Sequence, residues 1–464
     1  MRYVSTRGAA PELDFEEAML TGLARDGGLY LPAAVPRFEA DELAALAGRP
    51  YEEVAQRVIA PFTGDSFSHD ELSGAIARAC AAINHPARAP LAQIGPNHFV
   101  LELFHGPTLA FKDFAMQLIG QLFEISLKRR GRRATIIGAT SGDTGSAAIE
   151  AFAGLEAVDV VILFPDGRVS AVQRRQMTTP GAANVHALAI EGDFDAAQAR
   201  VKDMFNDFAF RDAVGLAAVN SINWARVLAQ TVYYFTSAVA LGAPYRSVAY
   251  AVPTGNFGDV YAGWVARRMG LPIERLVVAT NRNDILHRTL TSGDHTRRRV
   301  EPTTSPSMDI QISSNFERLL FDLLDRDAEA VAELMRALRE DGGFRLGNQA
   351  LDRLRAEFAS GMATDEDVAA TIAAVAELTG QVLDPHTAVG VKAAADARGD
   401  PAVPMVVLGT AHAAKFPDAV EAACGRRPAL PPRLADLMTR PERLTRVPND
   451  LAVIQGLIRE GAEA

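Results

Sequence analysis

Lys112 is the residue of this chain whose type and setting best suit covalent chemistry. It lies between two apolar side chains, Phe111 and Phe114, where a loop with Gly106 and Pro107 meets an amphipathic segment. Apolar neighbours desolvate a lysine and favour its neutral amine, which is the form that attacks an aldehyde. Taken alone, a lysine in such a run is more often a solvated surface charge. The choice between the two interpretations depends on the loops further along the chain.

A second feature is the polar loop that follows the apolar run 134–138. It reads Thr140-Ser141-Gly142-Asp143-Thr144-Gly145 and leads into a segment of helical pattern. Its glycines allow a close approach of the backbone, and a helix that begins there offers free N–H groups and the positive end of its dipole. With its hydroxyl groups, the loop suits a small anion such as a carboxylate. A helix cap that binds no ligand is an equally open interpretation.

A comparable loop follows the apolar run 247–252 and precedes a helix that begins near Val260. Its residues are Gly255, Asn256, Phe257 and Gly258. A glycine-bracketed turn at a helix N-terminus makes a phosphate cradle from backbone N–H groups. The loop lacks the Gly-Lys-Ser/Thr ending of a P-loop and the spacing of a dinucleotide fingerprint. Two such loops and one apolar-flanked lysine are together a stronger indication of a binding site than any of the three alone.

Three further residues could complete a site for an anionic ligand. Ser221 lies at the start of a helical segment, where capping the helix is its more common role. Arg226, one turn further on, has the planar donors that suit a phosphate. Thr410 follows the apolar run 405–409, where its hydroxyl could bond a ring nitrogen or could simply end a strand.

The segments around these loops indicate an α/β fold. Short apolar runs at 134–138, 158–164, 185–190, 247–252, 276–280 and 405–409 alternate with helical patterns such as 113–129 and 223–241. This order predicts parallel-rich open sheets that are covered by helices on both faces. Ligands of such sheets gather at the carboxyl ends of strands, which is where the polar loops follow. A helical stretch from about 316 to 380 is expected to pack outside the sheet.

The length of 464 residues and the hydrophobic share of 48% suffice for two or three domains. We expect a mainly helical domain over 1–95. An α/β domain over 96–240 would then carry Lys112 and the loop around Asp143. A second α/β domain over 241–464 would carry the loop around Asn256, together with a helical insertion.

Composition and charge exclude several classes of protein. The net charge of -10 argues against nucleic acids and anionic membranes as partners. Cys80 and Cys424 are far apart, which suits a reducing cytoplasm and gives no disulfide framework. No apolar run has membrane-spanning length, and the N-terminus lacks the apolar core of a signal peptide. The nine histidines form no pair with metal-ligand spacing, so no metal site is predicted.

With these motifs the chain resembles the threonine synthase family of pyridoxal-phosphate enzymes, which have fold type II, the tryptophan-synthase-β-like fold. The resemblance runs from Tyr3-x-Ser5-Thr6-Arg7-Gly8 near the N-terminus to Thr410-Ala411-His412-Ala413-Ala414-Lys415-Phe416. Its most specific stretches are His105-Gly106-Pro107-Thr108-x-Ala110-Phe111-Lys112-Asp113 and Thr140-Ser141-Gly142-Asp143-Thr144-Gly145. It therefore covers nearly the whole chain.

The resemblance implies a role for each candidate residue. Lys112 matches the catalytic lysine that carries pyridoxal 5'-phosphate as an imine and then acts as a base. The cofactor phosphate would be held by Gly255, Asn256, Phe257 and Gly258, and Thr410 would face the pyridine nitrogen. The substrate carboxylate would be bound by Thr140, Ser141, Gly142 and Thr144, and the substrate phosphate by Ser221 and Arg226.

The chain departs from common patterns of this fold at three places. Asp143 stands where many relatives have an asparagine that contacts the 3-hydroxyl oxygen of the cofactor, and an ionised carboxylate would repel a phenolate there. His412 is followed by Ala413 in place of the common proline. Trp224 likewise replaces a proline after Asn223, so the start of the helix differs and the match of Arg226 to a phosphate-binding position is less specific.

The implied reaction converts O-phospho-L-homoserine and water into L-threonine and phosphate by γ-elimination and β-hydration, with no nucleic-acid or membrane partner. We expect a monomer or a weak homodimer. Two rival hypotheses are an O-phosphohomoserine phospholyase that yields 2-oxobutyrate and a cofactor-binding homologue without catalysis.

Overall fold

Two separate sheets form the framework of the computed structural model, which describes residues 1–140, 142–167 and 169–463. The larger sheet has the strand order β13-β10-β9-β14-β4-β3. Its strands are β3 (Leu91–Gly95), β4 (His98–Glu102), β9 (Val248–Pro253), β10 (Ile273–Thr280), β13 (Phe358–Met362) and β14 (Met405–Gly409). All neighbouring strands are parallel except β3 and β4, which form an antiparallel pair.

The smaller sheet is parallel throughout and has the order β15-β7-β6-β5-β8. Its strands are β5 (Ala134–Ala139), β6 (Val158–Pro165), β7 (Val185–Ile190), β8 (Leu216–Ala217) and β15 (Thr445–Val447). The sequence pattern predicts the long strands of both sheets to within a few residues. It missed the strands that have few residues or little apolar character.

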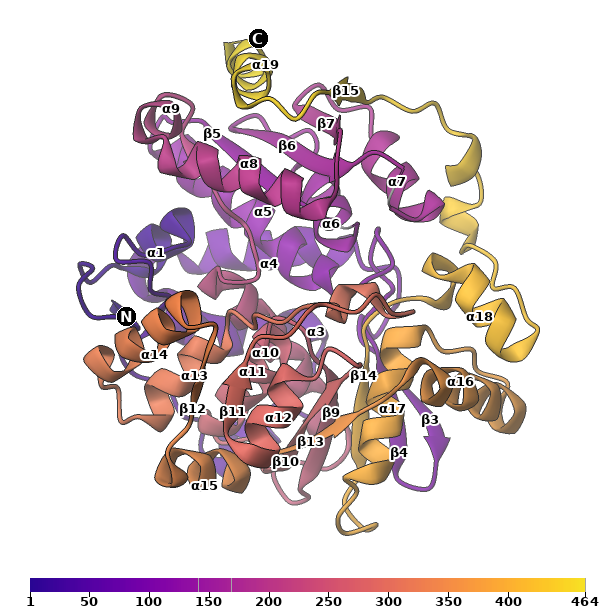
Figure 1. Ribbon diagram of the computed structural model, residues 1–464. Coiled ribbons are helices and arrows are strands. Elements are labelled where there is room, and N and C mark those ends of the chain that lie inside the picture. Colours follow the sequence, from indigo (N-terminus) through magenta and orange to yellow (C-terminus); the bar gives the residue numbers. More distant parts are fainter. Residues whose placement is uncertain (141, 168, 464) are drawn as a thin grey trace.

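Helices cover both faces of each sheet, as the uninterrupted apolar strands require. In β6, Val160 and Ile162 belong to the core shared with α5 and α6, whereas Val161 and Leu163 face the core under α8 and α19. The helices after β4, apart from those between β10 and α17, are α5 (Lys112–Arg129), α6 (Asp143–Phe152), α7 (Ala171–Thr178), α8 (Phe194–Asn206), α9 (Phe208–Ala213), α10 (Trp224–Ala240), α11 (Gly258–Arg268), α17 (Pro385–Asp396), α18 (Pro417–Cys424) and α19 (Leu451–Glu463). Figure 1 shows the smaller sheet with its helices above the larger one.

The N-terminal segment is mainly helical, as expected, with one small antiparallel pair. Its elements are β1 (Tyr3–Ser5), α1 (Phe15–Thr21), β2 (Tyr30–Pro32), α2 (Ala40–Ala44), α3 (Tyr51–Thr63) and α4 (His69–Ala81). α3 packs on α10, and α4 packs on α5. Tyr3 and Phe62 contact the buried Trp224, which anchors this segment to the start of α10.

The region between β10 and β14 corrects one expectation. The stretch from 316 to 380 is not wholly helical, because β13 pairs with β10 and forms an edge of the larger sheet. The other elements here are α12 (Ile285–Ser292), β11 (Asp294–Thr296), α13 (Phe316–Leu323), α14 (Ala328–Glu340), β12 (Gly343–Arg345), α15 (Asn348–Glu357) and α16 (Asp365–Thr379). The strand was hidden because its sequence, Phe-Ala-Ser-Gly-Met, has no β-branched residue.

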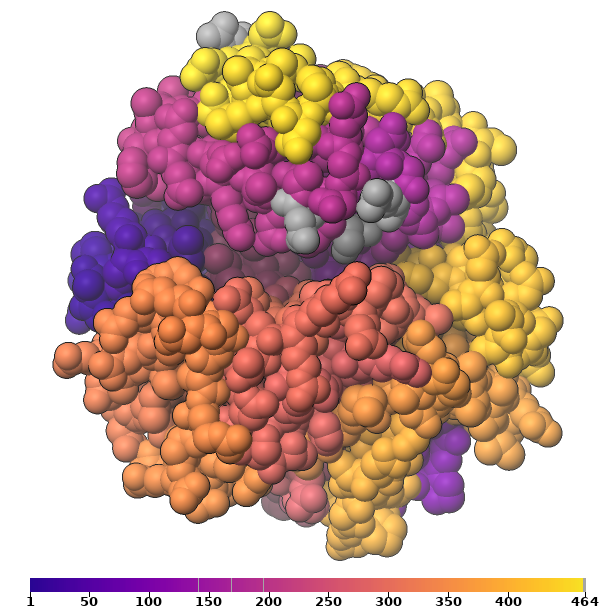
Figure 2. Space-filling model, in the orientation of Figure 1, coloured from indigo at the N-terminus to yellow at the C-terminus, as the bar shows by residue number. Residues whose placement is uncertain are grey.

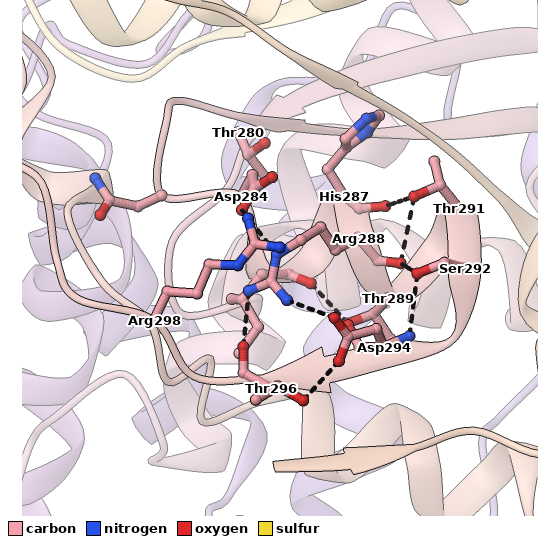
Figure 3. Close-up of polar contacts among 12 residues, drawn as sticks. Thr280, Asp284, His287, Arg288, Thr289, Thr291, Ser292, Asp294, Thr296 and Arg298 are labelled. Carbon is pink, nitrogen blue, oxygen red and sulfur yellow. Dashed lines mark hydrogen bonds and ion pairs between the residues drawn. The ribbon is translucent and has the colours of Figure 1, made fainter. Parts of the chain in front are cut away.

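Arg288 ties α12 to β11 in this region (Figure 3). Its guanidinium group donates to Asp284 at 2.9 Å, to Asp294 at 3.0 Å and to the carbonyl of Thr296 at 2.7 Å. One side chain thereby fixes the turn between the helix and the strand.

The division into domains at 95 and 240 stays a prediction. The sheets do not follow this division, because β4 of the expected 96–240 domain lies in the larger sheet and β15 of the expected 241–464 domain joins the smaller one. No helix among the residues described is long and apolar enough to cross a membrane.

Candidate active site

The candidate residues come together where strands of both sheets end. Lys112 begins α5 shortly after β4, the Asp143 loop follows β5, and the Asn256 loop follows β9. Ala110 and Ala411 form a β-bridge, and the N–H of Phe111 donates to the carbonyl of Thr410 at 2.9 Å. Figure 2 shows a groove between the magenta half, which contains the smaller sheet, and the orange half.

The amine of Lys112 is buried, and its side chain lies against the Phe111 ring. Only 9% of the residue is exposed, and Nζ lies 4.9 Å from the ring centroid and 3.2 Å from Oδ2 of Asp143. Desolvation lowers the pKa of Lys112, and the positive charges of Lys415 and Arg226 lower it further, against the opposing effect of Asp143. The buried setting that the sequence indicated is thus present.

A tight loop places Lys112 at the first turn of its helix. Asp113 accepts hydrogen bonds from the backbone N–H of Thr108 at 2.9 Å and from its hydroxyl at 2.6 Å. A Cβ atom on Gly106 would lie 2.3 Å from this carboxylate, so only glycine fits. Burial raises the pKa of Asp113 to about 6, with the Thr108 hydrogen bonds opposing the shift.

Asp143 is the centre of the polar contacts at the site. Its Oδ1 accepts from Lys415 at 2.7 Å and from Gln173 at 2.9 Å, and its Oδ2 accepts from Lys112 at 3.2 Å and from Ser307 at 3.1 Å. Desolvation would raise the pKa of Asp143, but Lys112 and Lys415 outweigh it and hold this pKa well below the ordinary value. The carboxyl group is therefore ionised.

The loop before α6 is built around one hydroxyl. The Oγ1 atom of Thr140 accepts from the N–H groups of Gly142 at 2.9 Å and Gly145 at 3.0 Å, so its hydrogen stays available for a ligand. Gly142 has a φ of 142°, and a Cβ there would lie 2.3 Å from Gln173. Thr144 is half-buried in the first turn of α6. Ser141 lies outside the residues that the structure describes.

The loop between β9 and α11 presents backbone donors at a helix N-terminus. The N–H groups of Asn256, Phe257 and Gly258 make no hydrogen bond to any residue that the structure describes. Phe257 has a φ of 63°, which turns the chain sharply before α11. Asn315 supports the loop by donating from Nδ2 to the carbonyl of Asn256 at 3.0 Å. Successive free N–H groups at such a place suit a phosphate.

Ser221 and Arg226 lie on the side of this loop. The same Asn315 Nδ2 donates to the carbonyl of Ser221 at 3.0 Å, so one amide joins the two segments. Arg226 is 3% exposed, and within the described chain its Nε has no hydrogen-bond partner. Desolvation lowers the pKa of Arg226 to about 10. A buried guanidinium with a free donor suits an anionic ligand.

Family models and known relatives identify the chain. The model described as threonine synthase N terminus matches residues 2–80, that of pyridoxal-phosphate dependent enzymes matches 85–411, and that of the threonine synthase C-terminal region matches 387–458. The chain belongs to the threonine synthase family. A threonine synthase from Pseudomonas aeruginosa is 53% identical over 99% of this chain and 98% of its own length.

Solved structures agree with this assignment. A crystal structure of PLP-bound threonine synthase from Brucella melitensis is 57% identical, covers 100% of both chains and has a TM-score of 0.98. The yeast threonine synthase structure is 38% identical, covers 100% of this chain and 99% of its own, and has a TM-score of 0.95. The expected fold type II, the enzyme class and the dependence on pyridoxal 5'-phosphate are confirmed.

The residues of this threonine synthase family member fit the cofactor. Lys112 offers a desolvated amine for its aldehyde, and the free N–H groups from Asn256 to Gly258 offer a cradle for its phosphate. A Cβ atom on Gly255 would lie 3.0 Å from the carbonyl of Ser307, so a side chain there would be tightly packed. Thr410 is next to the bridge that positions Lys112. The part of the chain described holds no group of side chains that could bind a metal ion.

Sequence reasoning missed three residues that bond Asp143: Lys415, Gln173 and Ser307. Lys415 carried a usable signal, because the chain has only five lysines and otherwise uses arginine for its cations, and Lys415 is flanked by apolar residues as Lys112 is. Gln173 and Ser307 gave no signal, because both reach the site from segments remote in sequence.

Proposed function

We propose that this protein converts O-phospho-L-homoserine and water into L-threonine and inorganic phosphate. The buried amine of Lys112, placed between two strand-to-helix loops suited to anions, is the observation that carries the proposal. Membership of the threonine synthase family supports the same reaction.

The two anionic groups of this substrate have matching donors. The N-terminus of α6 with Thr140 and Thr144 suits the carboxylate, because the positive end of the helix dipole lies there and Thr140, whose oxygen accepts from Gly142 and Gly145, keeps its hydroxyl hydrogen to donate. The buried guanidinium of Arg226 and the nearby Ser221 suit the phosphate. Binding both ends would hold the carbon chain in a fixed orientation next to Lys112.

Lys112 is the group that moves protons. Bound pyridoxal phosphate supplies an electron sink for a negative charge at the substrate carbon. Once free of its link to the cofactor, the neutral Lys112 amine can remove a proton from Cα and then from Cβ. Its lowered pKa keeps it neutral near physiological pH more than an ordinary lysine. The hydroxyl of Thr410, unlike a carboxylate, would leave a facing ring nitrogen largely unprotonated.

We also infer a cytoplasmic location and a monomer or weak homodimer. Cys80 and Cys424 are free thiols, as a reducing compartment would allow. Large exposed apolar side chains among the described residues come from separate elements, for example Phe208 in α9, Leu378 in α16 and Val453 in α19. Such isolated side chains do not form the broad apolar patch of an obligate dimer.

Product analysis tests the reaction. Purified holoenzyme given O-phospho-L-homoserine should release L-threonine and phosphate in equal amounts, as measured by amino-acid chromatography and a phosphate assay. Formation of 2-oxobutyrate and ammonia as main products would establish a phospholyase instead. Absence of turnover with cofactor bound would support the inactive homologue.

Replacement of the proposed base is the first variant to examine. Lys112→Ala should lower turnover by about 10³-fold or more and remove the borohydride-stable cofactor adduct, because the other amine at Asp143, Lys415, is held by the carboxylate and by the carbonyl of Thr108. Mass spectrometry of the reduced protein locates the adduct. Lys392→Ala, which changes a lysine paired with Asp396 on the surface, is the control and should keep both properties. An adduct that persists in Lys112→Ala would refute the assignment.

A further inference from the structure

We infer that Lys415 is a positioning residue of the cofactor site, which neutralises Asp143 so that an ionised carboxylate can stand beside the cofactor and hold the free Lys112 amine. The inference rests on the proposed function in that it takes Lys112 as the cofactor-bearing base. Its subject is the charge arrangement around that base.

The geometry of Asp143 requires a negative charge there. Its two oxygens accept four hydrogen bonds from Lys112, Lys415, Gln173 and Ser307, which come from four different segments. Two carboxylate oxygens provide about four acceptor positions, and a protonated carboxyl group would turn one of them into a donor. The first turn of α6 also favours a negative charge.

Lys415 is placed to supply the compensating charge. Its side chain is fully buried, and Nζ donates to Asp143 Oδ1 and to the carbonyl of Thr108, both at 2.7 Å. Thr108 belongs to the loop that holds Asp113 and so positions Lys112. Lys415 therefore connects the carboxylate to the loop of the catalytic lysine.

Two lysines can fill two roles that a single lysine could not. Lys415 carries the countercharge of Asp143, and Lys112 is then able to become neutral or to bond the cofactor. If Lys112 were the only partner of Asp143, the carboxylate would lose its countercharge whenever Lys112 became neutral or was bonded to the cofactor. A buried unpaired carboxylate is strongly unfavourable and would repel the oxygen of a phenolate. With Lys415 present, the pair is neutral in those states. Asp143 and Lys415 together can then stand where relatives of this fold have an uncharged asparagine.

Lys415 also contributes to the charge state of Lys112. Its positive charge disfavours a second ammonium group nearby and lowers the pKa of Lys112. The other charged groups around the amine are Asp113 in α5, Arg226 in α10 and Asp259 in α11. None of these three bonds Asp143 in the chain as described. The charge of Lys415 also lowers the pKa of Asp113, so only the effects of Arg226 and Asp259 should persist unchanged when Lys415 is replaced.

Charge-swap variants of the full chain without cofactor test the inference. Chemical acetylation of Lys112 over a pH series, quantified by mass spectrometry, gives the midpoint at which the amine becomes reactive. Lys415→Met should raise this midpoint by about one pH unit or more, because Lys112 then pairs alone with the carboxylate. Asp143→Asn, which keeps the side-chain volume, should lower it. Asp143→Asn/Lys415→Met should lie between the two single variants.

Cofactor affinity gives a second measurement. Lys415→Met should bind pyridoxal phosphate about 10-fold more weakly or worse, and the double variant should recover most of that loss, because it removes the unpaired charge. Lys392→Met is the matched control and should behave as the wild type in both measurements. If Lys415→Met does not fold, Asp143→Asn and the double variant still decide the question.

Two results would overturn the inference: a Lys112 midpoint that stays unchanged or rises in Asp143→Asn, or a double variant that binds cofactor no better than Lys415→Met. The test is independent of product identity. A wild type that forms 2-oxobutyrate would defeat the proposed function and leave the midpoint shifts in place, whereas a threonine-forming wild type with unshifted variants would defeat only the role of Lys415.

Discussion

Burial shifts the pKa of the ionisable groups at the site toward their neutral forms, and charged or hydrogen-bonding partners oppose or outweigh that shift. Among the described residues, Lys112 bonds one carboxylate and has a lowered pKa, whereas Asp143 has two lysine partners and stays ionised. Asp259, which follows the loop 255–258 between β9 and α11, accepts hydrogen bonds from the hydroxyls of Tyr233 at 2.5 Å and Tyr234 at 3.1 Å. Burial raises the pKa of Asp259 to about 7.

The raised pKa of Asp259 predicts a fall in stability with rising pH. The fold favours the protonated carboxyl of Asp259, which therefore contributes to the unfolding free energy. That contribution is fully present below the ordinary pKa of 3.8 and is lost as the pH rises through the raised pKa of about 7. Asp259→Asn resembles the protonated form and should reduce the change in unfolding free energy over this range by about 2 kcal/mol or more. Urea denaturation at several pH values measures this change in unfolding free energy.

The control is Asp352→Asn, on the exposed face of α15, which should show the same pH dependence as the wild type. An Asp259→Asn protein with the full pH dependence would contradict the prediction.

The loop before Lys112 should tolerate no side chain at Gly106. A Cβ there would lie 2.3 Å from Asp113, so Gly106→Ala should displace the carboxylate and lower the unfolding free energy by about 1–3 kcal/mol. Cofactor binding should weaken as well, because the same loop positions Lys112. Thermal denaturation and cofactor titration measure both effects. Gly181→Ala is the control, since a Cβ at that glycine meets nothing within 4 Å. Equal behaviour of the two variants would refute this account of the loop.

At the scale of elements, the helices that follow strands direct their N-termini to one place. α5, α6 and α11 each begin at the site, and each follows a strand that ends there. Around them, short elements are fixed by single polar side chains. Asn315 joins the segments of Ser221 and Asn256, and Arg288 joins α12 to β11.

Arg288 offers a test of such an element-fixing contact. Arg288→Met should lower the unfolding free energy by about 2 kcal/mol, because Asp284, Asp294 and the carbonyl of Thr296 lose a common donor (Figure 3). Arg298→Met is the control, since Arg298 is exposed and its Nη1 lies 3.8 Å from Asp284. It should change stability by less than about 0.5 kcal/mol. Differential scanning calorimetry measures both, and an equal effect of the two would show that the Arg288 contacts are not stabilising.

At the scale of the molecule, the chain repeatedly crosses between the two sheets, and the site lies where it crosses. Ser307 and Lys415 come from segments around the larger sheet, yet both bond Asp143 in the helix after β5. His386 holds the Ser307 segment by accepting from its N–H at 3.1 Å. After β14 the chain returns, and β15 and α19 cover the smaller sheet.

The returning C-terminal segment should be needed for stability of the smaller sheet. Ile454 in α19 is fully buried in a core with Leu188 and Met204, so Ile454→Ala should cost about 2–5 kcal/mol. Val453→Ala, at the neighbouring position with 42% of its surface exposed, should cost much less. Chemical denaturation of both variants measures the difference. A similar loss in both would show that α19 does not pack as described.

The sequence by itself determined the long apolar strands and the loops that follow them. Those features depend on local patterns: apolar runs such as 158–164 and 405–409, and glycines next to helix starts such as Gly142 and Gly258. Lys112 could be selected because its neighbours in sequence are also its neighbours in space. The family resemblance supplied the cofactor and the reaction.

Only the tertiary structure decided which residues set the charges of the site. Lys415, Gln173 and Ser307 reach Asp143 from 30 residues or more away in sequence, so no local pattern reveals the contacts. The edge strand β13 was likewise defined by its pairing with β10 and not by its composition. Charge state depends on burial and on the nearest opposite charge, and both are properties of the folded chain.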